Sequence, residues 1–347
     1  MLPNMFNVDY TYLMPLLTVS RLYKRFNLEA GFFARFGRFV NAVNDISFFI
    51  EKNESYGLVG ESGCGKTTTA RMLVRMYEAD AGEILFYEGD TPVPVTSLGK
   101  EQLREYREKV RYVFQDPARS LNPRMSVYEV LVSGCRRPLK KRGVDEKELR
   151  RKAASILEEA GLQEADLEKR PSEFSGGQRQ RISIARALLM EPEILICHEV
   201  VSALDVSIQG QILNLLLDIR EKRNISFLFI AHDLKVACYF CDRIGVMYRG
   251  ELMEEAPAAG LYSEALHPYT QLLFSCAAGI TGKRALNTPH SSPNTPFPAL
   301  PSCSFAPRCA KASERCFREH PALAEIRAGH SIRCFNYAAA DIPSCNP

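Results

Sequence analysis

Short apolar runs alternate with amphipathic stretches from Leu16 to about Cys276. Five of these runs have the length and composition of buried strands: SYGLVG, VRYVFQ, EILIC, ISFLFIAH and RIGVMY. Helical stretches follow several of them, and this order is typical of an α/β domain in which helices connect the strands. The pattern therefore predicts one α/β domain over residues 16–279.

One interval of this domain breaks the alternation. From about Asp116 to Ser175 the chain has charged helical stretches such as VDEKELRRKAASILEEAG and no convincing buried strand. A period near 3.6 without strand signals favours helices. We expect a helical insertion here.

The remaining segments differ from the α/β domain in their composition. Residues 1–15 are expected to form a tail, and the Pro-, Ser- and Thr-rich residues 280–302 an extended linker before a cysteine-rich extension at 303–347. The early stretch NLEAGFFARFGRFV mixes phenylalanines with Arg35 and Arg38. It is interpreted as a hairpin tip or lengthened turn, with contact to a membrane partner as the alternative.

Charge and hydropathy narrow the class of protein. The 347 residues include 44 Lys and Arg against 41 Asp and Glu, so the net charge of +3 gives no indication of nucleic acid as a partner. No apolar run approaches the roughly 18 to 20 residues of a membrane-spanning helix. The N-terminus also lacks a basic region followed by an apolar block, so we expect a cytosolic protein.

A phosphate-binding loop follows the first buried strand. The motif GxxxxGK[ST] is formed by Gly60, Glu61, Ser62, Gly63, Cys64, Gly65, Lys66 and Thr67. Glycines let backbone N–H groups turn toward phosphates, and the helix that continues through Thr68 adds its positive end. Lys66 is expected to neutralise the β and γ charges, and Thr67 to hold Mg²⁺. The motif indicates nucleotide binding.

A second anion-binding turn appears at Ser175, Gly176, Gly177 and Gln178, where a Ser-Gly-Gly turn opens a basic amphipathic helix. One triphosphate does not need two such cradles in one chain. With these motifs the chain resembles the ATP-binding subunits of ABC transporters. Further motifs follow the family's order: Gln115 in VFQDP, Glu199, Ser202 to Asp205, and His232 in IAHD.

Four stretches of sequence resemble the oligopeptide and dipeptide importer ATPases in particular: VGESGCGKTT, VFQDPARSLNPRMSV, EFSGGQRQRISIARAL and LHPYTQLL. That group also serves nickel and glutathione systems. The tail PSCSFAPRCAKASERC…GHSIRC resembles the group's C-terminal extension. The resemblance implies a P-loop NTPase fold, with a RecA-like core, a β subdomain and an inserted helical subdomain.

The resemblance also implies partners. Two such domains dimerise head to tail, so that each ATP lies between the P-loop of one and the signature turn of the other. The implied assembly contains a second ATPase subunit, two membrane permeases and, indirectly, an extracellular solute-binding protein. It would place this chain at the cytoplasmic face of the cell membrane.

Roles for single residues come from the same resemblance. Phe26 would stack on adenine, with Tyr23 as the alternative. Glu199 would act as general base, His232 would contact the γ-phosphate, and Gln115 would contact Mg²⁺ and report the γ-phosphate to the membrane subunit. Asp205 would lie across the dimer interface.

His198 departs from the family, which has aspartate there, and Val200 stands where relatives usually have proline. Neutral histidine lacks the charge that the aspartate supplies to the Mg²⁺ shell. One unit charge at ~4 Å and an effective dielectric of ~20 is worth about 4 kcal/mol before relaxation. Our hypothesis is that this site binds ATP but hydrolyses it slowly, while its signature completes the site of a competent partner in a heterodimer. A sequence error or tolerated drift is the alternative.

Four C-terminal cysteines, Cys303, Cys309, Cys316 and Cys334, have the spacing Cys-x5-Cys-x6-Cys-x17-Cys. Four thiolates can hold a [4Fe–4S] cluster or Zn²⁺, and free buried thiols are the third possibility. The resemblance favours the cluster. His320 and His330 lie in the same segment and are interpreted as structural.

The sequence is compatible with several functions. The leading one is the motor of a peptide importer. The others are a non-hydrolytic nucleotide-binding partner, nickel or glutathione import, and an ABC ATPase that acts on ribosomes or DNA. The last class typically has two ATPase domains in one chain or a long coiled-coil insertion, and neither is apparent here.

Overall fold

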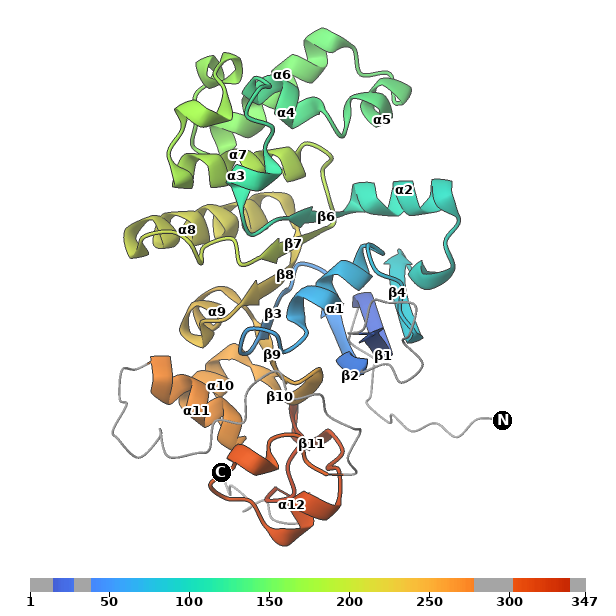
Figure 1. Cartoon of the computed structure of the whole chain (residues 1–347). Helices are drawn as coiled ribbons and strands as arrows, with labels where there is room; N and C mark the ends of the chain where they lie inside the picture. Colours follow the sequence, from blue (N-terminus) through green and yellow to red (C-terminus); the bar gives the residue numbers. More distant parts are fainter. Residues whose placement is uncertain (1–14, 28–38, 278–301, 338–347) are drawn as a thin grey trace.

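The computed structural model describes residues 15–27, 39–277 and 302–337 (Figure 1). The expectations for the N-terminal tail, for most of the phenylalanine-rich stretch and for nearly all of the linker fall outside the described residues. Within these ranges the chain forms two β-sheets, a group of helices at one end and a C-terminal segment at the other. None of the helices in these ranges is long and apolar enough to cross a membrane.

The smaller sheet is antiparallel and has the order β2-β1-β4-β5. Its strands are β1 (Pro15–Asn27), β2 (Phe39–Glu51), β4 (Ala81–Glu88) and β5 (Thr91–Pro94). Alternate residues of β1 such as Leu17 and Val19 are fully buried. The sheet therefore has one packed face and one polar face, as expected of an antiparallel sheet.

The larger sheet has the order β11-β12-β10-β9-β3-β8-β7-β6, in which β10 (Glu251–Pro257), β11 (Ala324–Arg327) and β12 (His330–Ile332) form an antiparallel end. Its parallel part consists of β3 (Ser55–Val59), β6 (Val110–Val113), β7 (Ile194–His198), β8 (Ser226–Ala231) and β9 (Arg243–Tyr248). The five strands predicted from apolar runs are these five. Because both faces are covered, parallel strands lack polar alternation, and this explains why continuous apolar runs identified them.

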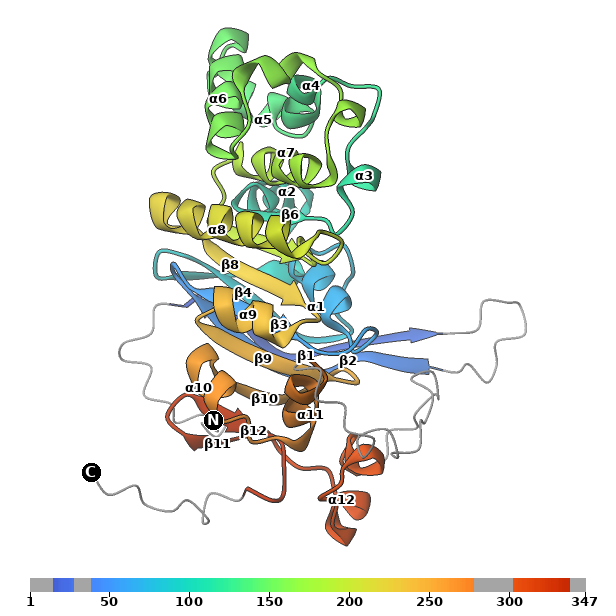
Figure 2. The same ribbon diagram turned by 90° about the vertical axis from the view of Figure 1, so that its left-hand side faces the viewer.

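The two faces of the larger sheet pack against different layers (Figure 2). Leu195 and Phe227 pack into a core shared with the helices α8 (Val206–Arg223) and α9 (Leu234–Phe240). Ile196 and Leu228 face the other way, toward the helix α1 (Lys66–Leu73) and the smaller sheet. The period of two along each strand thus sends successive side chains into two cores.

Helices fill the chain between β6 and β7. They are α3 (Pro117–Ser120), α4 (Val127–Val132), α5 (Arg136–Lys141), α6 (Glu146–Glu159) and α7 (Gly176–Leu188). Helix α6 begins where the Asp145 carboxylate accepts a hydrogen bond of 2.7 Å from the backbone of Glu148, an N-cap. Leu149, Ala153 and Ile156 repeat at helical spacing and are buried. The α/β fold with an inserted helical subdomain is confirmed. Another helix, α2 (Lys100–Lys109), precedes β6.

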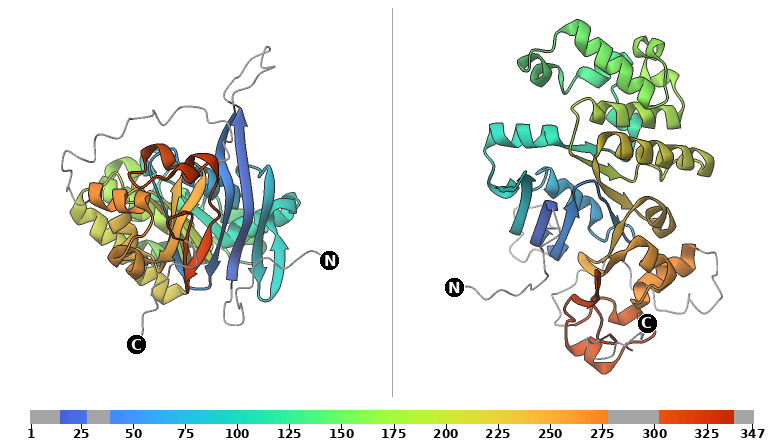
Figure 3. Two further views of the ribbon diagram at one scale, coloured as in Figure 1. Left: turned by 90° about the horizontal axis from the view of Figure 1, so that it is seen from below. Right: turned by 180° about the vertical axis from the view of Figure 1, so that it is seen from behind.

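The cysteine-rich extension joins the larger sheet rather than standing apart (Figure 3). Strand β12 (His330–Ile332) pairs antiparallel with β10 (Glu251–Pro257) and with β11 (Ala324–Arg327). The fully buried carboxylate of Glu254 lies 2.8 Å from His330 Nε2, and Glu251 lies 2.8 Å from His320 Nε2. The two histidines therefore help to dock the extension. Short helices α10 (Ala258–Ser263), α11 (Pro268–Ala277) and α12 (Glu314–Arg318) complete this end.

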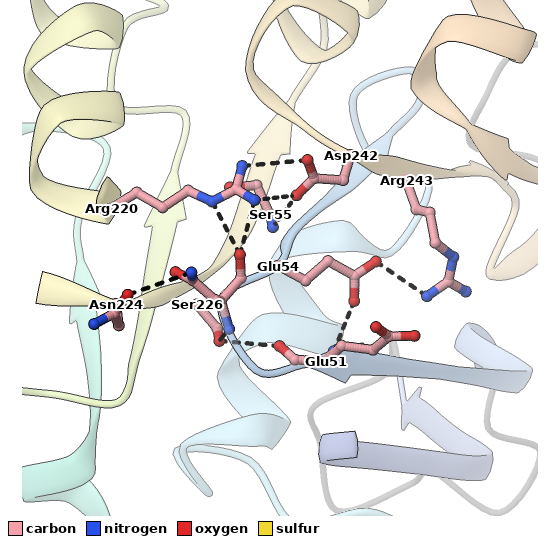
Figure 4. Close-up of polar contacts among 9 residues, drawn as sticks. Glu51, Glu54, Ser55, Arg220, Asn224, Ser226, Asp242 and Arg243 are labelled. Carbon is pink, nitrogen blue, oxygen red and sulfur yellow. Dashed lines mark hydrogen bonds and ion pairs between the residues drawn. The ribbon is translucent and has the colours of Figure 1, made fainter. Parts of the chain in front are cut away.

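A network of polar contacts holds the amino ends of β3, β8 and β9 (Figure 4). The Arg220 guanidinium donates to the Asn53 carbonyl at 2.7 Å and pairs with Asp242 at 2.7 Å. The Asp242 carboxylate also accepts from the backbone of Ser55 at 2.8 Å. Arg243 bridges the carboxylates of Glu54 and Glu255. These contacts fix where the parallel strands begin, at the end of the sheet opposite the P-loop.

Candidate functional site

The P-loop spans the turn between β3 and α1, at the carboxyl end of the sheet. Gly60 and Gly65 have positive φ angles of 156° and 112°. A Cβ on Gly60 would lie 2.2 Å from the Met247 carbonyl oxygen, and one on Gly65 2.1 Å from that of Ala42. Both the backbone conformation and the close neighbouring backbone therefore require glycine at these two positions.

Lys66 lies folded against this loop. Its side chain is only 4% exposed, and its ammonium donates to the carbonyl oxygens of Gly60 at 2.6 Å and Glu61 at 3.0 Å. A cation held by neutral carbonyls, next to the positive N-terminus of α1, makes a binding position for phosphate. Cys64 is buried beside it, and burial raises the pKa of its thiol.

His198 ends β7 and reaches the first turn of α1. Its Nε2 lies 2.8 Å from the Thr67 hydroxyl, and the residue is 6% exposed. Burial lowers the pKa of His198; the Glu199 carboxylate opposes this shift, whereas Arg71 and Lys66 add to it. The ring is therefore neutral at pH 7. Two of the three residues predicted to organise Mg²⁺, Thr67 and His198, are in contact here, with an imidazole in place of the carboxylate.

Glu199 follows at once in a left-handed conformation, with a φ angle of 49°. Non-glycine residues in that region are strained, and such strain concentrates at functional sites. Gln115 Nε2 donates to the Glu199 carboxylate at 2.6 Å, although 84 residues separate them. His232 lines a small pocket together with Glu199 and Ser202. The structure thus gathers Gln115, Glu199 and His232 at one edge, while Val200 is buried in the core.

The signature turn forms a second helix start away from the P-loop. The Ser175 hydroxyl accepts from the Gln178 backbone at 3.3 Å, and the Gln178 side chain accepts from the Ser175 backbone at 2.9 Å, a capping box. A Cβ on Gly177 would lie 2.7 Å from Ile208 of α8, so α7 packs closely there. Figure 1 shows α7 beyond β6 and β7 from α1. Asp205 and Val206 at the start of α8 are exposed, Val206 at 84%.

The family follows from the similarity of this chain to known proteins. A family model described as "ABC transporter" matches residues 43–202, and one described as "Oligopeptide/dipeptide transporter, C-terminal region" matches residues 253–316. A probable peptide ABC transporter ATP-binding protein, y4tS, of Sinorhizobium fredii is 38% identical over 335 residues, which cover 96% of this chain and 93% of that protein. The chain belongs to the ATP-binding subunits of peptide ABC transporters.

Other relatives of this ABC subunit agree. The oligopeptide transport ATP-binding protein OppF of Bacillus subtilis is 49% identical over 236 residues, which cover 68% of this chain and 76% of OppF. A solved dimeric structure of the ATP-binding cassette MJ0796 bound to ADP and Pi has a TM-score of 0.60 and 26% identity, and covers 70% of this chain and 98% of the cassette. The predicted P-loop NTPase fold and the predicted family are confirmed.

The aromatic residue predicted to stack on adenine lies at the end of β1 in the ABC subunit. Phe26 packs edge to face on Tyr77 with ring centroids 5.4 Å apart, and the Lys24 ammonium lies 5.5 Å from its ring centre. Tyr23 is engaged elsewhere. Burial raises the pKa of its hydroxyl, as does a hydrogen bond with Asp45. Phe26, unlike Tyr23, has no side-chain group that hydrogen bonds could hold in place.

The four C-terminal cysteines of the subunit gather but do not form a metal site. The Cys303 backbone donates to the Cys316 carbonyl at 2.9 Å. Burial raises the pKa of Cys303 to about 11, and the neighbouring Cys316 and Cys334 contribute. In the part of the chain that the structure describes, no group of three or more Cys, His, Asp or Glu side chains is arranged to hold a metal ion. As folded here, the thiols therefore do not fit a cluster or Zn²⁺.

Sequence reasoning missed two residues that contact the P-loop. Tyr269 of α11 accepts a hydrogen bond of 3.0 Å from the Glu61 backbone. Arg308 of the 3₁₀ helix η5 (Ala306–Arg308) pairs with the Glu61 carboxylate. They lie 208 and 247 residues from Glu61. No local pattern marks such distant contacts.

Proposed function

We propose that this chain is a motor subunit of an importer of oligopeptides or dipeptides. It would couple the binding and hydrolysis of ATP to uptake, at the cytoplasmic face of the membrane and together with two permease subunits. An extracellular solute-binding protein would deliver the solute. The names of the relatives and the matched C-terminal region support this proposal.

The P-loop carries the nucleotide part of the proposal. The triphosphate would occupy the inner side of the loop, where Lys66 and the amide groups at the start of α1 offset its charge. Phe26 would stack on the adenine. In this arrangement Glu199 would orient the attacking water, and His232 would contact the γ-phosphate. Catalysis of phosphoryl transfer is mostly positioning and charge stabilisation, which suits such a site.

The Thr67–His198 contact supports a specific account of the departure at position 198. A neutral imidazole protonated on Nδ1 would accept a hydrogen bond from the Thr67 hydroxyl through Nε2 and leave the Thr67 oxygen free for Mg²⁺. Gln115 would offer its amide oxygen. His198 then keeps the hydrogen-bond acceptor of the family's aspartate but not its negative charge. ATP binding survives, and hydrolysis at this site slows very roughly a hundredfold or more.

Two chains would form each complete site. The signature turn lies apart from the P-loop of its own chain, and Asp205 and Val206 are exposed where a partner would pack. We propose a heterodimer in which the Ser175 turn of this chain completes the ATP site of a second, competent ATPase subunit. Hydrolysis at that other site would then drive transport.

Restoring the charge tests the proposal. In the assembled transporter, His198→Asp should raise Mg²⁺-dependent ATP turnover at this chain's own site about tenfold or more in nucleotide-trapping assays. His198→Asn is the matched control, because it has nearly the shape of aspartate without the charge, and it should leave turnover low.

High turnover of the unmodified site, with no change in His198→Asp, would defeat the impaired-site proposal. Low turnover in both would favour a purely nucleotide-binding partner. The solute is tested separately, because competition of labelled peptide uptake by unlabelled peptides, nickel or glutathione distinguishes the three classes of importer.

A [4Fe–4S] cluster at Cys303, Cys309, Cys316 and Cys334, or Zn²⁺ in its place, stays a prediction. The gathering of the four thiols supports it, whereas their arrangement would have to tighten to bind a metal. Iron and sulfide in stoichiometric amounts in anaerobically purified protein would support the cluster, and their absence would reject it.

A further inference from the structure

A bidentate ion pair joins the cysteine-rich extension to the P-loop. Arg308 Nη1 donates to Glu61 Oε2 at 2.9 Å, and Arg308 Nη2 donates to Glu61 Oε1 at 2.9 Å. The two side chains are 23% and 39% exposed, so water reaches the pair only in part. Parallel double hydrogen bonds of this kind fix the direction of both groups as well as their distance.

Aromatic rings hold the arginine in this place. The Arg308 guanidinium lies 5.6 Å from the ring centre of Tyr248 and 5.8 Å from that of Phe305. Tyr248 and Phe305 are buried and also pack on Tyr269, with ring centroids 4.7 and 5.4 Å away. A guanidinium stacked among buried rings loses little freedom on forming its hydrogen bonds.

Glu61 is consequently fixed at three points. Its carboxylate is held by Arg308, its N–H donates to the buried Tyr269 hydroxyl at 3.0 Å, and its carbonyl accepts from Lys66 at 3.0 Å. Two of these three contacts come from the C-terminal part of the chain. The path of the P-loop backbone at its second residue therefore depends on elements beyond the ATPase core strands.

Charge adds a second consequence. The Glu61 carboxylate is attached to the loop that would hold a triphosphate, and an uncompensated negative charge there would oppose the nucleotide. Arg308 offsets that charge. We propose that Arg308 is a positioning residue for the nucleotide, which orients the P-loop through Glu61 and neutralises it, so that the packing of the extension sets nucleotide affinity. This inference depends on the nucleotide site under Proposed function.

Equilibrium binding of a fluorescent ATP analogue to the full chain tests the inference. Arg308→Ala should weaken binding about tenfold, and adding Glu61→Gln to it should restore most of the loss, because the uncompensated charge is removed. Arg308→Lys keeps a positive charge without the fork, so its affinity should fall less. Amide hydrogen exchange at residues 60–65 should nevertheless quicken in that variant.

Arg327→Ala is the matched control. Arg327 also joins the extension to the ATPase domain through two hydrogen bonds, of 2.7 and 3.3 Å, to the Glu264 carboxylate, but it lies on β11. It should change neither affinity nor exchange at the P-loop. Thermal unfolding of all variants reports whether each one folds, and Arg308→Lys serves if Arg308→Ala does not.

Unchanged affinity in Arg308→Ala, or a loss that Glu61→Gln does not relieve together with normal exchange in Arg308→Lys, would overturn the inference. If Arg327→Ala weakens binding equally, the extension acts only through general stability, and the inference also fails. Absence of nucleotide binding in the unmodified chain would instead refute the proposed function itself.

Discussion

The polar side chains at the two ends of the parallel strands differ in the partners that they contact. At the amino ends, Asp242 and Glu54 each have both an arginine and a backbone N–H as partners (Figure 4). At the carboxyl ends, the Lys66 ammonium contacts two carbonyl oxygens and a thiol sulfur of the loop, none of which is charged. Glu199 has a strained backbone, and its carboxylate accepts a hydrogen bond from the Gln115 amide. One end is satisfied by the protein, whereas the other is arranged for a ligand.

The same strand serves both ends. β3 begins at Ser55, whose N–H binds Asp242, and leads into Gly60 after five fully covered residues. Buried hydrogen bonds and ion pairs at the amino end therefore stabilise the sheet, whereas Lys66 and Glu199 at the carboxyl end would, under the proposed function, act on the nucleotide. Substitutions at the amino ends should therefore change the free energy of unfolding, and substitutions at the carboxyl ends should change nucleotide affinity.

The largest effect is expected at Lys66. Lys66→Ala should weaken ATP binding at least ~100-fold, or about 3 kcal/mol, because it removes the cation that lies against the loop carbonyls where the phosphates would bind. The melting temperature should change little or rise, since a buried ammonium held by neutral carbonyls is desolvated at a cost. Titration calorimetry and thermal unfolding measure the two quantities. Lys109→Ala, which removes a half-exposed pair with Glu88, is the control. A large loss of stability without loss of affinity would contradict this prediction.

Arg243 at the amino ends should show the converse. Its side chain is 19% exposed, and its partners Glu54 and Glu255 are 7% and 11% exposed. Removing one member of such a buried network leaves uncompensated charge, so Arg243→Ala should lower the free energy of unfolding by about 3 kcal/mol. ATP affinity should stay within twofold.

Acid should partly relieve that loss. Burial raises the pKa of Glu54 and Glu255 even though Arg243 opposes the shift. A carboxyl whose pKa is raised on folding destabilises the folded state at high pH, and this cost disappears as the pH falls through the raised pKa. Arg243→Ala should therefore be less destabilised at pH 5 than at pH 8. Urea unfolding at both pH values checks this. Arg136→Ala, which breaks an exposed pair, should behave like the unmodified chain at both.

Local patterns account for what the sequence could predict. The parallel strands follow from continuous apolar runs, and the P-loop from a motif whose glycines and lysine act within eight neighbouring residues. The departure at His198 was visible in the sequence as well. Its hydrogen bond to Thr67 was not, because the contact joins residues 131 positions apart.

The contacts made by the cysteine-rich extension were harder to predict from the sequence. Strand β12 has only three residues, too few for a periodic signal, yet it extends the main sheet. Arg308 could be paired with Glu61 only once the fold had brought η5 to the P-loop. The cysteine spacing likewise predicted a cluster of thiols but not how closely they approach, since side-chain rotamers and packing decide that distance.

Glu251 is expected to show a smaller effect. It lies near the carboxyl end of the sheet, since the neighbouring Gly250 N–H binds the Cys64 carbonyl of the P-loop at 2.8 Å. Nevertheless its carboxylate is satisfied, by Asn44 at 2.7 Å, Ser304 at 2.8 Å and His320 at 2.8 Å. If pairing rather than location decides the role, Glu251→Gln should cost about 1 to 2 kcal/mol of stability at pH 7 and leave ATP affinity unchanged.

The pKa of Glu251 determines how the destabilisation by Glu251→Gln should change with pH. Burial raises the pKa of Glu251, but the hydrogen bond and charge of His320 and the charge of Arg333 outweigh it, so the net pKa is lowered from 4.5. A carboxyl with a lowered pKa stabilises the fold above its unfolded pKa, and this contribution disappears as pH falls through the folded value. The destabilisation by Glu251→Gln should therefore be complete near neutral pH and shrink below about pH 4.5. Urea unfolding from pH 7 to 3.5 measures it, with the exposed Glu101→Gln as control. A fall in ATP affinity with unchanged stability would show instead that location at the carboxyl end decides the role.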